Sequence, residues 1–198
     1  MSSKALALSI ALCALAAPLA QSVGHTRADA LSLQKKIDDI KAFSAKPTKQ
    51  AHRITVTENE VNAYLNLELK DEMPVGVVEP GVSALGGGRV TARAVVDLDA
   101  VRKGKASRSL LDPLNYVSGR LPMTATGVLT TGNGVARLQF ESAAIGRLPV
   151  PKLVLQEIVS YYSRSESKPA GIDLDEPFEL PSRIREIQVE TGRAIVVQ

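Results

Sequence analysis

The chain has 198 residues, a formal net charge of only +3, no tryptophan, and aromatic side chains at 4% of its positions. So small a positive charge gives no electrostatic reason to expect nucleic-acid binding, and few rings are available to stack on bases or sugars. The length is enough for one ordinary domain with its own core.

The N-terminus begins with a short positive region at Lys4, followed by an apolar run from Ala5 to Ala17. The run is too short to span a bilayer comfortably and ends in small residues. This predicts a secretory signal peptide over residues 1–24, and a periplasmic or secreted protein after cleavage. An uncleaved anchor and a buried helix are the alternatives. Cys13, the only cysteine, lies inside this segment, so a cleaved chain has no thiol for a disulfide or a metal site.

Residues 25–52 are expected to form an N-terminal amphipathic helix and a polar linker. Leu33, Ile37, Ile40 and Phe43 recur at helical spacing between charged residues. The linker contains proline and polar residues. His25 and His52, the two histidines, are predicted to be solvated.

Residues 53–198 are predicted to form a single α+β domain. Ile54 and Val56 mark a short strand, and Thr57 with Glu60 has the spacing of a capping box that opens a helix. Three hairpins dominate the remainder: residues 77–85 with 89–101, 121–130 with 135–144, and 184–190 with 194–197. Short helices are expected over 110–117 and 151–162. The predicted fold is a curved antiparallel sheet of hairpins wrapped on two or three helices.

Period-two alternation assigns the faces of the second and third strands of this sheet. One face should carry Val90, Ala92, Ala94 and Val96, with Arg89, Thr91, Arg93, Asp97 and Asp99 on the other. In the next hairpin, Met123, Ala125, Gly127 and Leu129 should share a face with Ala136, Leu138, Phe140, Ser142 and Ala144. The apolar side chains are small, which is compatible both with a densely packed core and with a groove for a long, thin ligand.

No catalytic pattern is present in the sequence. It has no G-x-S-x-G elbow, and Gly86–Gly88 joins two strands and so is a hairpin turn, not a phosphate loop. The D-x-D pairs Asp97/Asp99 and Asp173/Asp175 are expected to be solvated and to bind no metal. We therefore expect a protein that is not an enzyme and uses no cofactor.

The segment from Leu148 to Tyr162 is unusually apolar for a surface helix. Pro149 and Pro151 mark the beginning of the helix, because proline fits the first turn. Placed at 100° per residue, its apolar side chains cover an arc of roughly 160°, against about 100° for an ordinary surface helix. A basic cluster elsewhere is expected to be a solvated loop or, alternatively, a contact with anionic lipid headgroups; its members are Arg102, Lys103, Lys105 and Arg108.

Four sequence segments, in this order along the chain, resemble small exported bacterial proteins of the tubular lipid-binding type. This type includes the LmeA-like phospholipid-binding proteins. The segments are ITVTENEVNAYLNLEL, VxxPGVSALGGGRVTARAVVDLD, AIGRLPVPKLVLQEIV and PFELPSRIREIQVETGRAIV. The resemblance covers residues 53–198 as a pattern of elements. It implies a curved sheet around helices with an apolar tunnel for acyl chains or similar ligands.

The function implied is an exported, non-enzymatic lipid-binding or lipid-transfer module, whose partners are a lipid or other long apolar ligand and an anionic membrane surface. The alternative is a non-catalytic cell-envelope structural or protein-interaction domain with a closed core. The lining side chains on the helices and the sheet are expected to be Val61, Tyr64, Leu65, Leu69, Val90, Ala92, Ala94, Met123, Ala125, Phe140, Leu155, Ile158, Val159 and Tyr162.

Overall fold

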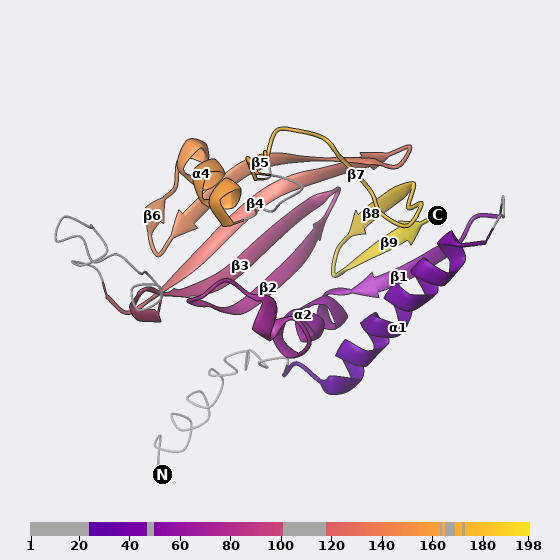
Figure 1. The fold of residues 1–198 in the computed structure, drawn as a ribbon, viewed down its shortest axis with the longest axis horizontal. Helices are drawn as coiled ribbons and strands as arrows, with labels where there is room; N and C mark the ends of the chain where they lie inside the picture. The colour runs from indigo at the N-terminus through magenta and orange to yellow at the C-terminus, as the bar shows by residue number, and fades with distance from the viewer. Residues whose placement is uncertain (1–23, 47–49, 101–117, 163, 165–168, 172) are drawn as a thin grey trace, which may run out of the picture.

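The fold is α+β, as predicted, with a six-stranded and a three-stranded antiparallel sheet (Figure 1). The computed structural model describes residues 24–46, 50–100, 118–162, 164, 169–171 and 173–198. The predicted signal peptide, apart from Gly24, and the helix expected over 110–117 lie outside the described residues.

The large sheet has the strand order β2-β3-β4-β5-β6, and β7 also pairs with β5. Its strands are β2 (Val77–Gly86), β3 (Arg89–Asp97), β4 (Arg120–Gly132), β5 (Val135–Ile145), β6 (Leu148–Pro149) and β7 (Phe178–Glu179). The small sheet has the order β1-β9-β8, formed by β1 (Arg53–Thr57), β9 (Arg193–Val197) and β8 (Glu186–Glu190). The helices are α1 (Arg27–Ser44), α2 (Glu58–Leu67), the 3-10 helix η1 (Lys70–Glu72) and α4 (Lys152–Tyr162).

The predicted capping box at the beginning of α2 is confirmed. The Thr57 hydroxyl accepts a hydrogen bond from Glu60 N at 3.3 Å, and Glu60 Oε2 accepts one from Thr57 N at 2.8 Å. The hairpin turn between β4 and β5 is also where the sequence predicts it. Asn133 and Gly134 both have positive φ, 52° and 82°, as a tight turn of this type requires.

Strand β3 ends earlier than predicted, at Asp97 instead of Val101. The Asp97 carboxylate accepts hydrogen bonds from Asp99 N at 3.1 Å and Ala100 N at 2.9 Å, and a helical turn begins at Leu98. These bonds from Ala100 N and Asp99 N, with the Arg120 guanidinium, lower the pKa of Asp97. The prediction that Asp97 and Asp99 alternate on the wet face of one strand is therefore wrong, because Asp97 caps a turn that ends the strand.

The hydrophobic core lies between α1 and the small sheet, and it ties the N-terminal helix to the C-terminal hairpin. Its buried members are Leu33, Ile40, Ile54, Val56, Ile184 and Val196. Among the described residues, no large side chain is fully buried. The sequence predicts helices over one face of the sheet, but this core is built beside the large sheet and leaves much of that sheet uncovered.

Helix α2 lies along the free edge of β2. Side chains four residues apart on the helix reach backbone groups two residues apart on the strand. The two spacings agree, because four helical residues rise about 6.0 Å and two strand residues about 6.6 Å. The helix thereby covers an edge that would otherwise be open to pairing with another chain. The bonds join Asn66 to Pro80 O, Asn62 to Val82 N and O, and Glu58 to Ala84 N.

The free edge of β8 is closed in a similar way by the β4–β5 end of the large sheet. The Thr131 hydroxyl donates to Ile187 O at 3.0 Å and accepts from Ile187 N at 2.8 Å. Gly134 N donates to Arg185 O at 3.0 Å. These bonds hold the small sheet against one end of the large sheet.

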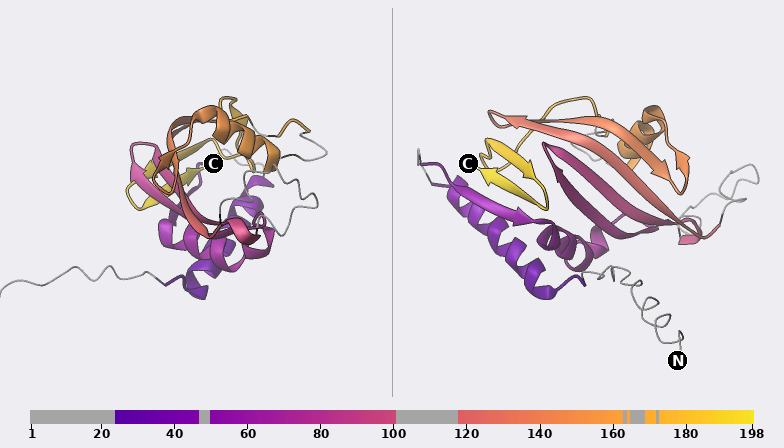
Figure 2. Two further views of the ribbon diagram at one scale, coloured as in Figure 1. Left: turned by 90° about the vertical axis from the view of Figure 1, so that its left-hand side faces the viewer. Right: turned by 180° about the vertical axis from the view of Figure 1, so that it is seen from behind.

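The large sheet is strongly curved. Viewed from the end that carries β6 and α4, it forms a trough, and the C-terminus lies on the concave side (Figure 2, left). Thr131 shares a face with Leu129 by strand alternation, and its side chain bonds the small sheet. The concave face is therefore the face that carries Leu129.

Candidate functional site

Much of the concave face of the large sheet is formed by apolar residues in cross-strand register. Directly paired residues of an antiparallel sheet present their side chains on the same side. Three rows run across neighbouring strands, and together we call them the apolar face: Val82–Ala92–Ala125–Ala143, Ala94–Met123–Ile145–Leu148, and Ala84–Val90–Gly127–Phe140.

The apolar face is open to solvent in its centre. Ala92 lies in the middle of the sheet yet is exposed, and Val82, Val90 and Phe140 are only half-buried. The buried members are small, namely Ala84, Ala94, Gly127 and Ala143. A packed core would bury the large side chains as well, so this face is incompletely covered by the rest of the protein.

The six sheet residues predicted to line a lipid site lie together on this face. The register gives Val90, Ala92 and Ala94 on β3, Met123 and Ala125 on β4, and Phe140 on β5. Alternation along each strand is what identifies them from sequence, because it depends only on local geometry.

A β-bulge at Glu141 changes the face of the residues that follow it on β5. Thr126 pairs with Ser142 while Gly127 pairs with Phe140, so Glu141 is the extra residue. Ser142 and Ala144 consequently lie on the convex face, and the prediction that they share a face with Phe140 is wrong. Ala143 and Ile145 take their places on the apolar face, and the prediction missed them because simple alternation has no signal for a bulge.

The convex face carries more polar side chains than the concave face. Ser83, Thr91, Thr126 and Ser142 form a row across it, with the Thr91 and Thr126 hydroxyls 2.9 Å apart. Arg89 makes two hydrogen bonds with the bulge carboxylate Glu141, at 2.8 and 2.9 Å. The guanidinium lowers the pKa of Glu141. The concave face is therefore the more apolar of the two.

The side chains in and just after α2 that were predicted to face these sheet residues lie elsewhere in the structure. Val61 and Tyr64 pack against the core cluster beside α1, and the Tyr64 hydroxyl donates to Gln34 Oε1 at 3.0 Å. Leu65 lines a pocket of about 510 Å³ between the end of α2 and the beginning of β2, and Leu69 is half-buried next to it. Because α2 lies on the strand edge, the structure does not bring these four residues opposite the apolar face.

Helix α4 lies at the β5–β6 end of the large sheet (Figure 1). Leu155 is buried and Val159 is half-buried, so this side of the helix packs on the protein. The side chains of Ile158 and Tyr162 lie outside the described residues, as do all four predicted headgroup contacts (Arg102, Lys103, Lys105 and Arg108). An ion pair between Lys152 and Asp175 ties the first turn of α4 to the following segment.

Two exposed leucines at this end were not singled out from the sequence. Leu148 on β6 and Leu153 in the first turn of α4 are each 73% exposed, and Val154 is 47% exposed. The sequence signal is the phrase RLPVPKL, in which large apolar residues alternate with prolines and cations. Leu153 lies outside the main apolar stripe of the helix, so helical periodicity does not identify it.

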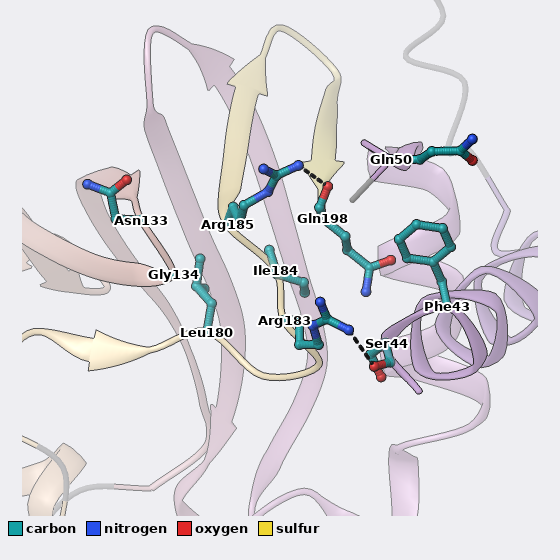
Figure 3. Close-up of a pocket in the computed structure, with 10 residues that line it drawn as sticks. All are labelled: Phe43, Ser44, Gln50, Asn133, Gly134, Leu180, Arg183, Ile184, Arg185 and Gln198. Carbon is teal, nitrogen blue, oxygen red and sulfur yellow. Dashed lines mark hydrogen bonds between the residues drawn. The ribbon is translucent and has the colours of Figure 1, made fainter. Parts of the chain in front are cut away.

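A separate polar pocket of about 290 Å³ lies where α1, the β4–β5 turn and the C-terminus meet (Figure 3). Arg183 Nη1 donates to Ser44 O at 3.3 Å and to Lys46 O at 3.0 Å. Arg185 Nη2 donates to Gln198 O at 2.5 Å. Both guanidinium groups hold backbone carbonyls, so the pocket joins α1 to the small sheet and lies apart from the apolar face.

His52 is not the solvated residue that the sequence predicts. It is half-buried, its ring centroid is 4.4 Å from that of Phe43, and its Nδ1 is 3.2 Å from Gln198 Oε1. In the part of the chain that the structure describes, there is no group of three or more histidine, cysteine or acidic side chains placed to hold a metal ion. None of the described helices combines the length and the apolar character needed to cross a bilayer.

Neither the protein-family models nor the curated proteins that were compared with this chain give a match.

Proposed function

We propose that this chain is a non-enzymatic lipid-binding or lipid-transfer protein, exported to the periplasm or secreted, with the apolar face as its ligand site. The observation that carries the proposal is the exposed apolar centre of the large sheet, where Ala92 is accessible and no polar side chain lies in the three rows. The resemblance of residues 53–198 to tubular lipid-binding proteins supports the same function.

The dimensions and chemistry of the face suit an acyl chain. Each row crosses four strands, and three strand spacings of about 4.8 Å give a width of about 14 Å. Transferring two acyl chains of a dozen methylenes each from an apolar environment into water costs on the order of 20 kcal/mol of free energy, at about 0.8 kcal/mol per methylene. A continuous apolar lining of small residues supplies the solvation such a ligand needs, with room for its thickness.

The alternative is a cell-envelope interaction domain that uses the same face to bind a protein. The exposed leucines at the β6–α4 end are compatible with this alternative, because exposed apolar side chains also mark surfaces that bind other proteins. A protein ligand and a lipid ligand are distinguished by what accompanies the purified chain.

The test is native mass spectrometry and organic extraction of the chain purified without detergent. Stoichiometric lipid in the extract, or uptake of a phospholipid supplied in mixed micelles, is the expected result. A chain that is free of lipid and takes none up would overturn the proposal, and a co-purifying protein in place of lipid would establish the alternative.

A further inference from the structure

We propose that the β6–α4 end of the large sheet is a membrane-docking edge that contacts anionic lipid headgroups and inserts Leu148 and Leu153 among them. We define the docking edge as Arg147, Leu148, Lys152 and Leu153. The inference rests on the proposed function for its purpose, since a lipid-binding chain must meet a donor or acceptor membrane. Of its four residues, only Leu148 also belongs to the apolar face.

The first support is the exposure of two large leucines in one short segment. Each is 73% exposed, more than any other large apolar side chain among the described residues. They belong to β6 and the first turn of α4, which lie side by side at one end of the molecule (Figure 1; Figure 2, right). Adjacent exposed leucines are typical of side chains that enter an interface.

The second support is the continuity of this edge with the apolar face. Leu148 pairs with Ile145, Ile145 with Met123, and Met123 with Ala94. Because directly paired side chains share a face, this row leads from the buried Ala94 to the exposed Leu148 without a polar side chain. An acyl chain leaving a membrane at Leu148 would therefore meet apolar contacts as far as the centre of the sheet.

The third support is the chemistry of the backbone at the edge. Pro149 and Pro151 have no N–H group, Val150 N donates to Ala143 O at 2.9 Å, and Leu148 is paired with Ile145. A segment that enters a lipid interface loses water from its backbone, and unbonded N–H groups there are unfavourable. From Pro149 to Pro151 those donors are absent or already bonded.

The charge at the edge favours anionic lipid over a neutral surface. Arg147 is exposed and has no carboxylate partner in the part of the chain that the structure describes. Lys152 is paired with Asp175 but remains largely at the surface. A free guanidinium next to inserted leucines is the arrangement expected for contact with phosphate headgroups.

The test is co-sedimentation of the full chain with vesicles of phosphatidylcholine containing 30% phosphatidylglycerol. We expect binding that falls on the order of tenfold in Leu148→Ser/Leu153→Ser, because each substitution removes an inserted apolar side chain. Leu31→Ser is the matched control, since Leu31 is an exposed leucine on α1 and should leave binding unchanged. Arg147→Glu should reduce binding about fivefold or more. Arg137→Glu, an exposed arginine near the opposite end of β5, should not.

The chain has no tryptophan, so the fluorescence of a single introduced tryptophan reports whether that position enters the membrane. Leu153→Trp should show a blue shift of its fluorescence when the same vesicles are added, and Leu31→Trp should not. Equal binding of the leucine variant and the unsubstituted chain, or no shift for Leu153→Trp, would overturn the docking edge. A dimer that the leucine variant converts to a monomer would show that the edge is an interface between copies, which also overturns the proposal.

Failure of the docking edge and failure of the proposed function give different results. If both hold, Arg147→Glu/Leu153→Ser, whose two residues lie outside the apolar face, loses vesicle binding but still takes up phospholipid supplied in mixed micelles. Vesicle binding without any lipid uptake would reject the ligand site and retain the docking edge. Lipid uptake with no vesicle binding by the unsubstituted chain would reject the docking edge alone.

Discussion

Asn62 of α2 bonds both backbone groups of Val82 on the edge of β2: its Oδ1 accepts from Val82 N at 2.7 Å and its Nδ2 donates to Val82 O at 3.0 Å. A side-chain amide here occupies the place that the backbone of a neighbouring strand would take. Asn62 is buried, so neither bond is readily replaced by water.

We expect Asn62→Ala to lower the free energy of unfolding by about 2–4 kcal/mol, because it leaves a buried N–H and a buried C=O unsatisfied. Urea denaturation followed by circular dichroism measures this. Asn59→Ala, an exposed position on the same helix, is the control and should change stability by less than about 0.5 kcal/mol. Equal effects of the two substitutions would show that the edge bonds contribute nothing.

The lowered pKa of the Glu60 carboxylate predicts that the protein loses stability in acid. Burial by itself raises the pKa of Glu60, but hydrogen bonds from Lys36, Ser32 and Thr57 outweigh burial and lower it from 4.5 to about 2. The unfolded chain therefore binds this proton at higher pH than the folded chain. The stabilisation is complete above about pH 4.5 and disappears as the pH falls toward 2.

We expect this group to contribute on the order of 3 kcal/mol at neutral pH, at 1.36 kcal/mol per pKa unit. Denaturation curves at pH 7, 4 and 3 should show a steeper loss for the unsubstituted chain than for Glu60→Gln, which is already destabilised at pH 7. Glu68→Gln, at the exposed end of the same helix, should keep the steep loss. Parallel pH profiles for Glu60→Gln and the unsubstituted chain would contradict the assignment.

Gly127 lies on the apolar face beside the bulge, where there is no room for a side chain. A Cβ at this position would lie 2.8 Å from Gln139 O and 3.2 Å from a Leu138 methyl group. Gly127→Ala should therefore destabilise the protein by about 1–3 kcal/mol through displacement of β5. Gly132→Ala, on the same strand with open space around it, should be tolerated, and thermal melts compare the two.

The Thr131 hydroxyl is the link between the large sheet and β8. Thr131→Val keeps the shape of the side chain but removes both bonds to Ile187, so we expect a loss of about 1–3 kcal/mol. Hydrogen exchange should show faster exchange of the Ile187 amide in this variant. Thr130→Val, the exposed neighbour, should leave that amide protected; if both variants exchange alike, the hydroxyl is not the link.

The proposed ligand site is tested by placing a charge on one face of the sheet and then on the other. Ala92→Glu should abolish phospholipid uptake, because an unpaired carboxylate among acyl chains is strongly disfavoured. It should change stability little, since Ala92 is already exposed. Thr124→Glu, exposed on the convex face opposite Arg93, should take up lipid normally. Uptake by Ala92→Glu at the normal level would remove the apolar face from the site.

Local patterns in the sequence were sufficient for the elements and for much of the sheet face. The capping box at Thr57 and Glu60, the Asn133-Gly134 turn and the alternation along β3 each depend on residues a few positions apart. Such features are determined by backbone geometry and short-range hydrogen bonds, which the order of residue types records directly.

Only the tertiary structure decided where these elements meet. The bulge at Glu141 places Ala143, and not Ser142, on the apolar face. Helix α2 lies along the edge of β2 instead of covering the sheet. Both depend on contacts between distant segments, Arg89 with Glu141 and Asn62 with Val82. The sequence alone determined that an apolar sheet face exists, because alternation is local. The packing of α1, α2 and the small sheet beside that face determined that its centre stays open, because coverage depends on which distant surfaces fit together.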